Sequence, residues 1–147
     1  MDETASTIYR THIAATPGRV WAELTAAGTP KAWMWDSVLT GSIAEGSSYA
    51  FRYDGEDLIT GTVLTVEAPV RLALTFNPEW DGTVAAEPPG VLEYTLEQAG
   101  GGCDLTVRIT GLHGASAISV DHDTPGIYAG LKTLLEAIPV AGQAEPV

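Results

Sequence analysis

The side chains that could carry acid–base chemistry or bind a metal ion are scattered along this chain of 147 residues. Of its three histidines, His12 falls in an expected strand, His113 follows the last expected strand, and His122 precedes the expected last helix. His122 lies in the segment SVDHDTPG, between Asp121 and Asp123. Their spacing matches no metal-ligand motif, and acidic residues ahead of a helix stabilise its N-terminus without a metal. We therefore predict neither a metal nor a cofactor.

Catalysis by a general acid or base needs a carboxylate or histidine inside a pocket with a shifted pKa. His113 and Asp36 lie near the ends of expected elements and could reach the rim of a cavity, whereas strand alternation places Glu93 and Glu97 on the outer face. The sequence has no nucleophile elbow, glycine-rich phosphate loop or HExxH motif. The only cysteine, Cys103, is expected to be a buried or half-buried structural thiol. No catalytic residue is assigned.

The aromatic residues indicate ligand binding more strongly than the ionisable residues indicate catalysis. A tyrosine hydroxyl can hydrogen-bond the polar end of a ligand while its ring faces an apolar body, so Tyr49, Tyr53 and Tyr94 are candidates for orienting groups. Hydrogen bonds to a neighbouring strand are the alternative for these hydroxyls. The candidate ligand-binding residues, expected on the inner face or at the mouth of a cavity, are Trp33, Trp35, Tyr49, Phe51, Tyr53, Phe76, Trp80, Tyr94, Tyr128 and Leu131.

The alternative role of such aromatic residues is packing in the hydrophobic core, and we favour it for Phe51 and Phe76. Trp80 differs because it lies in the long loop NPEWDGTVAAEPPG, where no core requires it. Long loops in compact domains often carry function, so Trp80 is a candidate for contact with a ligand or partner.

The elements that position these residues begin with a strand over Thr7–Ala15 and a helix over Pro17–Ala27 that stops at Gly28. Threonine before proline occurs at Thr16-Pro17 and again at Thr29-Pro30. Threonine is a good N-cap and proline suits the first helical position, so a second short helical turn is expected over Pro30–Met34.

Six further strands follow in a pattern of successive hairpins. Apolar residues alternate with polar ones along them, and Asp54-Gly55 suits a tight hairpin turn. The sequence therefore predicts an antiparallel meander that is apolar on one face and charged on the other. The expected strands are Ser37–Ile43, Tyr49–Asp54, Leu58–Glu67, Arg71–Asn77, Val91–Gln98 and Asp104–Thr110.

The last element is expected to be a helix capped at Thr124-Pro125 and ended by Pro139. Its apolar residues recur at helical period and form one stripe. A single domain over residues 1–139 and a flexible tail over 140–147 are expected. The stripe consists of Ile127, Leu131, Leu134, Leu135 and Ile138.

The charge excludes some partners. Nineteen acidic and seven basic residues give a formal net charge of −12. A negative field repels phosphate backbones and anionic lipid surfaces, so neither nucleic acid nor a membrane is expected as a partner. The acidic N-terminus and the lack of a long apolar run predict a soluble cytoplasmic protein.

The order of these elements resembles the START-like (SRPBCC) helix-grip superfamily, which includes relatives of the birch-pollen allergen and polyketide cyclases. Within it, the segment IAATPGRVWAELT with its following tryptophan pair resembles the homologues of the heat-shock-chaperone ATPase activator. APVRLALTF and the glycine-rich hairpin before CDLTVRITGL fit the same family. The tryptophan pair is usually adjacent in this family, whereas Met34 separates Trp33 from Trp35 here.

The resemblance implies an α+β helix-grip fold, with a seven-stranded antiparallel curved sheet around a long C-terminal helix and two short helices after the first strand. It also implies a deep apolar pocket between sheet and helix. We expect binding of a small hydrophobic or amphipathic ligand without catalysis. The alternatives are a cyclase- or hydrolase-like enzyme acting on a polyketide-type substrate and a chaperone-associated interaction module, with a protein partner or a homodimer.

Overall fold

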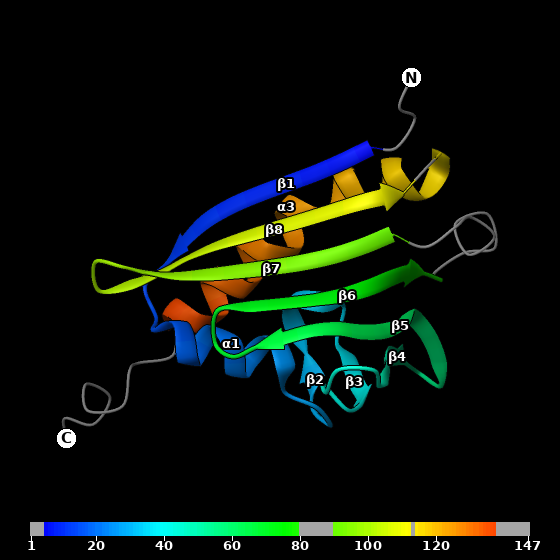
Figure 1. Cartoon of the computed structure of the whole chain (residues 1–147), viewed down its shortest axis with the longest axis horizontal. Helices are drawn as coiled ribbons and strands as arrows, with labels where there is room; N and C mark the ends of the chain where they lie inside the picture. Colours follow the sequence, from blue (N-terminus) through cyan, green and yellow to red (C-terminus); the bar gives the residue numbers. More distant parts are fainter. Residues whose placement is uncertain (1–4, 80–89, 113, 138–147) are drawn as a thin grey trace.

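The computed structural model describes residues 5–79, 90–112 and 114–137 (Figure 1). In these ranges, two α-helices and one short 3-10 helix accompany eight strands. The elements run in the order β1 (Ala5–Ile13), α1 (Pro17–Thr25), β2 (Pro30–Lys31), the 3-10 helix η1 (Ala32–Met34), β3 (Ser37–Gly41), β4 (Ser48–Tyr53), β5 (Glu56–Glu67), β6 (Arg71–Pro78), β7 (Gly90–Ala99), β8 (Gly102–Leu112) and α3 (Gly114–Ala137).

The strands form one antiparallel sheet in the order β1-β8-β7-β6-β5-β4-β3-β2. The meander is as predicted, and β1 joins it beside β8. The prediction of seven strands is wrong by one, because Pro30 and Lys31 pair with Val38 and Ser37 as a short edge strand. Pro30 fits an edge strand, where its missing N–H removes no necessary hydrogen bond.

The N-terminal helix begins at Pro17 as predicted but ends at Thr25, before the predicted stop at Gly28, and the second helix does not form as predicted. Thr16 caps α1, since its Oγ1 accepts a hydrogen bond from the Arg19 N–H at 3.2 Å. The predicted cap at Thr29-Pro30 is wrong, and the helical turn is reduced to the three residues of η1. A hydrogen bond from the Asp36 N–H to the Lys31 carbonyl, 2.9 Å long, closes the loop instead.

The helix α3 packs on β1 and η1, and Figure 1 shows it crossing one face of the sheet. It begins at Gly114, ten residues before the predicted cap, so that prediction is wrong. Thr124 and Pro125 lie inside the helix, and the Thr124 hydroxyl donates to the Val120 carbonyl at 2.6 Å. The predicted end at Pro139 and the predicted tail lie outside the described residues.

The side chains that face α3 form the core, and alternation predicted most of them correctly. The inward-facing residues of three central strands are all at most 5% exposed: Leu72, Leu74, Phe76, Leu92, Tyr94, Leu96, Leu105, Val107 and Ile109. Cys103 is also buried, as predicted.

Strand β4 breaks this pattern at its end. The pairing shifts between Phe51↔Ile59 and Arg52↔Asp57, so Leu58 has no partner across the strand. Tyr53 pairs with Glu56 beyond this irregularity and is 53% exposed, whereas Phe51 is buried.

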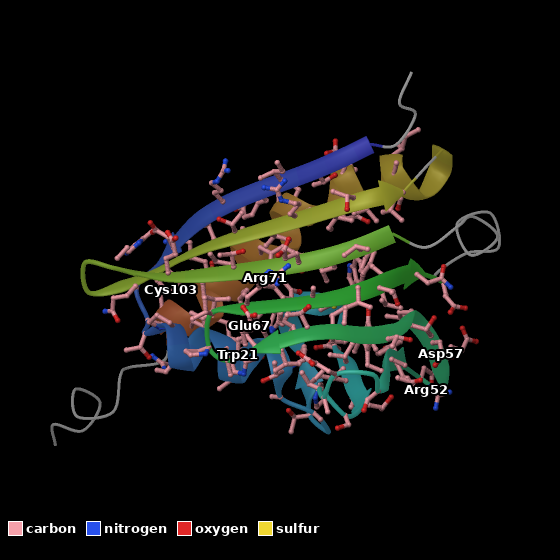
Figure 2. All side chains as sticks on the ribbon, viewed as in Figure 1. Trp21, Arg52, Asp57, Glu67, Arg71 and Cys103 are labelled. Atoms are coloured by element: carbon pink, nitrogen blue, oxygen red, sulfur yellow. The ribbon has the colours of Figure 1, made fainter. Side chains whose placement is uncertain are left out.

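The β4–β5 hairpin turns as predicted at Asp54-Gly55. Both residues have positive φ, +54° and +82°, as a tight hairpin turn requires. Figure 2 shows Arg52 and Asp57 together at this end of the sheet, where the Arg52 Nε donates to the Asp57 carboxylate at 2.8 Å. The Arg52 Nη2 also donates to the Gly55 carbonyl at 2.7 Å, so the bulged hairpin is held from one side.

Candidate binding groove

The space between the sheet and α3 is almost filled by side chains of the described residues. A narrow cavity remains there, with a volume of about 20 Å³, which is room for about one water molecule. It is much smaller than the deep pocket that the family resemblance implied. Its lining comprises Met34, Trp35, Ile59, Phe76, Ile109, Val120, Asp123, Thr124, Ile127 and Tyr128.

A pair of buried tyrosines lies beside this cavity. The hydroxyl oxygens of Tyr94 and Tyr128 are 2.6 Å apart, and the Tyr128 ring also packs against Trp33 with centroids 5.8 Å apart. Burial raises the pKa of both tyrosines above the ordinary value, so both hydroxyls stay protonated at neutral pH. Two protonated hydroxyls share one hydrogen bond between them.

The side chain of Tyr49 packs and forms its hydrogen bond within the sheet. Its hydroxyl donates to the Thr75 carbonyl at 2.6 Å, and its ring meets Phe51 edge-on at 6.0 Å. Gly61 makes room for the ring, because a Cβ at that position would stand 2.7 Å from Tyr49 Cε1 and 2.1 Å from the Thr75 oxygen. The neighbouring strand thus accounts for the hydroxyl of Tyr49.

An open groove of about 490 Å³ lies between the β4–β5 hairpin and α3, lined by Trp35, Tyr53, Leu58 and Asp123. Trp35 and Asp123 also line the narrow cavity, so the groove and the cavity meet at these two residues. Trp35 is 42% exposed although it is a large aromatic residue.

Trp35 reaches this position through an unusual backbone. Trp35 and Asp36 have φ of +56° and +61°, a left-handed conformation that costs a non-glycine residue of order 1 kcal/mol or more. Two consecutive residues of this kind form a sharp turn after η1 and place Trp35 at the surface while Trp33 stays buried. Strained backbone is frequent at binding sites, which makes this turn a pointer to function.

A second groove of about 350 Å³ shares Trp35 and Asp123 with the first. Trp35 and Asp123 each line both grooves and the cavity, so the three spaces meet at these two residues. The second groove is lined by Ala32, Trp33, Trp35, His122, Asp123, Gly126 and Ile127.

Buried polar contacts fix the position of Trp33. Its Nε1–H donates to the Glu23 carboxylate at 2.8 Å, and the Lys31 Nζ donates to the Glu23 carbonyl at 2.7 Å. Lys31 is 1% exposed and its ammonium lies 5.8 Å from the centre of the Trp33 ring. Burial lowers the pKa of Lys31, and the nearby Glu23 carboxylate opposes that shift. Lys31 thus caps the C-terminus of α1 from β2, a role that no local sequence pattern signals.

The structure places the predicted ligand-binding residues in different parts of the molecule. Trp35 and Tyr53 line the main groove, while Phe76 and Tyr128 line the cavity and Trp33 the second groove. Trp80 lies outside the described residues. The remaining candidates are buried in the core: Tyr49, Phe51, Tyr94 and Leu131.

The acid–base candidates are not brought together. Asp36 is exposed and is not among the described lining residues of the grooves or cavity, and His113 lies outside the described residues. His12 contacts Asp104 at 2.7 Å, in a separate surface groove with Glu97. Among the described residues, no group of three or more side chains could hold a metal ion.

Of the four described residues that line the main groove, the sequence did not predict two, Leu58 and Asp123. The expected cap at Thr124-Pro125 places Asp123 just ahead of the last helix, where it would not line a groove. With α3 continuous through Pro125, Asp123 lies four residues before Ile127 and eight before Leu131, on the same helical stripe. Extending the apolar stripe of the last helix toward the N-terminus, past Pro125, would have predicted that Asp123 lies on the face that packs against the sheet.

An antiparallel meander that curls around a long C-terminal helix is the helix-grip fold of the START-like (SRPBCC) superfamily. No helix in the described part of the chain has the length and apolar character needed to cross a membrane. A family model described as "Activator of Hsp90 ATPase homolog 1-like protein" matches residues 14–136, and the chain belongs to this family.

Solved structures of low sequence identity share the fold. CalU16 from Micromonospora echinospora is 21% identical, with a TM-score of 0.71 over 90% of this chain and 76% of its own. DynU16, described as a putative protein in the dynemicin biosynthetic locus, is 20% identical, with a TM-score of 0.72 over 92% of this chain and 48% of its own. The Aha1 dimer from Colwellia psychrerythraea is 15% identical, with a TM-score of 0.69 over 90% of this chain and 96% of its own. No curated protein matches.

Proposed function

We propose that the protein binds a small apolar molecule in the groove formed by Trp35, Tyr53, Leu58 and Asp123, without transforming it. The observation that carries this proposal is the exposure of two aromatic side chains around a groove of about 490 Å³. Small-molecule sites have volumes of about 300–1,000 Å³ and apolar walls with few polar groups. The strained turn that presents Trp35 supports the same site.

The exposed aromatic area is enough for useful affinity. Trp35 and Tyr53 are 42% and 53% exposed. For aromatic side chains of about 150–250 Å² each, a ligand could cover roughly 140–240 Å², which is worth about 4–6 kcal/mol at 25 cal/mol per Å². The ligand's own buried surface adds to this, and the cost of association subtracts from it. Binding in the micromolar range is therefore expected.

The lining favours binding over catalysis. An acid–base enzyme of the cyclase or hydrolase kind needs a matched proton donor and acceptor beside the substrate. The histidine–carboxylate contact found among the described residues, between His12 and Asp104, lies in a different groove. The alternative of an enzyme acting on a polyketide-type substrate has no comparable support at this site.

A tryptophan substitution tests the site directly. Binding of the neutral probe N-phenyl-1-naphthylamine is followed by its fluorescence in wild type, Trp35→Ala and the control Trp21→Phe. Trp21 lies on α1, apart from the β4–β5 hairpin in Figure 2. We expect saturable binding that Trp35→Ala weakens about tenfold or more and Trp21→Phe leaves unchanged. Absence of saturable binding, or equal loss in both variants, would refute the proposal.

The filled interior favours a second candidate, a protein-interaction module acting on a chaperone. A cavity of about 20 Å³ leaves little room for a ligand between sheet and helix, and the family is named for activation of the Hsp90 ATPase. The test is the ATPase rate of purified Hsp90 with increasing amounts of this protein. A dose-dependent increase supports this candidate, and an unchanged rate at saturating protein excludes it.

A further inference from the structure

The carboxylate of Asp123 is the one charged side chain among the described residues that line the main groove. It is half-buried, and no ion pair or hydrogen bond between described side chains involves it. All seven lysine and arginine residues of the chain are described, and none of them lines this groove or the second one. No lysine or arginine side chain therefore lies in either groove to pair with Asp123.

The surroundings of the groove strengthen its negative field. Asp36 follows Trp35 directly, and Asp54 and Glu56 follow Tyr53 in the hairpin; all three are exposed. The nearest described cation on that hairpin, Arg52, is paired with Asp57 and with a backbone carbonyl. With a net charge of −12 over the whole chain, the potential at the groove is negative.

Aromatic faces beside a carboxylate are suited to an organic cation. The rings of Trp35 and Tyr53 present negative π faces, which attract an ammonium group while their apolar area covers its substituents. A metal ion is a poorer match, because a single carboxylate among apolar walls offers too few oxygen ligands. An anionic ligand such as a fatty acid would face Asp123 with no cation to balance it.

We propose that this groove selects an organic cation, an amine or quaternary ammonium carried on an apolar body, with Asp123 as the residue that determines this selectivity. This inference rests on the proposed binding function. The apolar body lies against Trp35, Tyr53 and Leu58, and the cationic group points to Asp123. Neutral molecules of the same shape bind more weakly, and anionic ones more weakly still.

Calorimetric titration with three probes of one shape tests this selectivity: 2-naphthylmethyl-trimethylammonium, 2-naphthalenemethanol and 2-naphthaleneacetate. For a half-buried carboxylate, we expect the cation to bind about tenfold tighter than the neutral probe. Asp123→Asn should reduce this ratio to about twofold or less, since it keeps the shape and removes the charge. Glu97→Gln removes the same unit charge in a separate groove and should leave the ratio unchanged.

Salt provides a measurement that needs no variant. Raising the ionic strength should weaken binding of the cation to wild type and leave the neutral probe nearly unaffected. Equal affinities for the cationic and neutral probes in wild type, or a preference that survives Asp123→Asn, would overturn the inference while leaving the binding function intact. If none of the three probes binds, the proposed function itself fails and the inference falls with it.

Discussion

Removing the hydroxyl of Tyr128 alone is expected to destabilise the fold more than removing the hydroxyls of Tyr94 and Tyr128 together. The two oxygens lie 2.6 Å apart and both residues are at most 3% exposed. Tyr128→Phe leaves the Tyr94 hydroxyl buried without this partner, which costs about 1–3 kcal/mol. The double variant removes both polar groups, and such paired replacements are close to neutral, so it should cost no more than about 1 kcal/mol.

The two single variants should differ because only Tyr128 lines the cavity. In Tyr94→Phe, the remaining Tyr128 hydroxyl has beside it a space of about 20 Å³, large enough for one water. A water hydrogen bond there would recover part of the loss. We therefore expect about 1 kcal/mol for Tyr94→Phe and about 2–3 kcal/mol for Tyr128→Phe.

Urea unfolding followed by far-UV circular dichroism measures all four proteins of this double-mutant cycle. Tyr53→Phe is the control, since Tyr53 is exposed and its hydroxyl should contribute within about 0.5 kcal/mol. Additive losses in the double variant would refute the reasoning, because they would show that the two hydroxyls do not depend on each other. Single variants as stable as wild type would refute it as well.

Two further predictions concern the sheet and alkaline pH. Gly61→Ala should cost more than about 3 kcal/mol or prevent folding, because its Cβ would lie 2.1 Å from the Thr75 carbonyl oxygen; urea unfolding against Gly101→Ala, where the Cβ meets open space, measures this. Burial raises the pKa of the three core tyrosines, Tyr49 and the hydroxyl-sharing pair, so above pH 10 the unfolded chain releases protons that the native state keeps. The stabilisation from these tyrosines should therefore be fully present below pH 10, and the free energy of unfolding should fall above it by up to about 1.4 kcal/mol per pH unit for each tyrosine. The lowered pKa of Lys31 opposes this fall only below the ordinary lysine pKa of 10.5. Between pH 9 and 12, the urea midpoint should fall less steeply with pH in the double variant of Tyr94 and Tyr128 than in wild type. An equal slope in both proteins would contradict the attribution of the fall to these tyrosines.

Local sequence was sufficient where a short segment fixes its own geometry. Thr16 before Pro17 caps α1 in the structure as predicted, since the threonine oxygen and the N–H groups it binds lie within one turn. Asp54-Gly55 turns the hairpin because both residues tolerate positive φ. Alternation likewise indicated the buried face of the central strands, and the order of the motifs indicated the family.

Local sequence misled where the same signal can serve two geometries. Thr29-Pro30 and Thr124-Pro125 have the pattern of Thr16-Pro17, yet Pro30 is in an edge strand and Pro125 is inside α3. Packing of the residues before Pro125 against the sheet, as with the 3% exposed Val120, outweighs the local preference to break the helix. The positions of these two prolines thus depend on partners distant in the sequence.

The candidate binding groove likewise combines features that the sequence predicts with features that depend on the tertiary structure. Sequence alone determined that the chain is acidic, rich in aromatic residues on its inner face and built as a helix-grip fold. Only the tertiary structure decided which aromatic residues reach a surface groove: Tyr53 lies exposed beyond the register shift between β4 and β5, and a strained turn exposes Trp35. It also decided that Asp123 would face them, because the continuation of α3 through Pro125 depends on long-range packing that no short window of sequence contains.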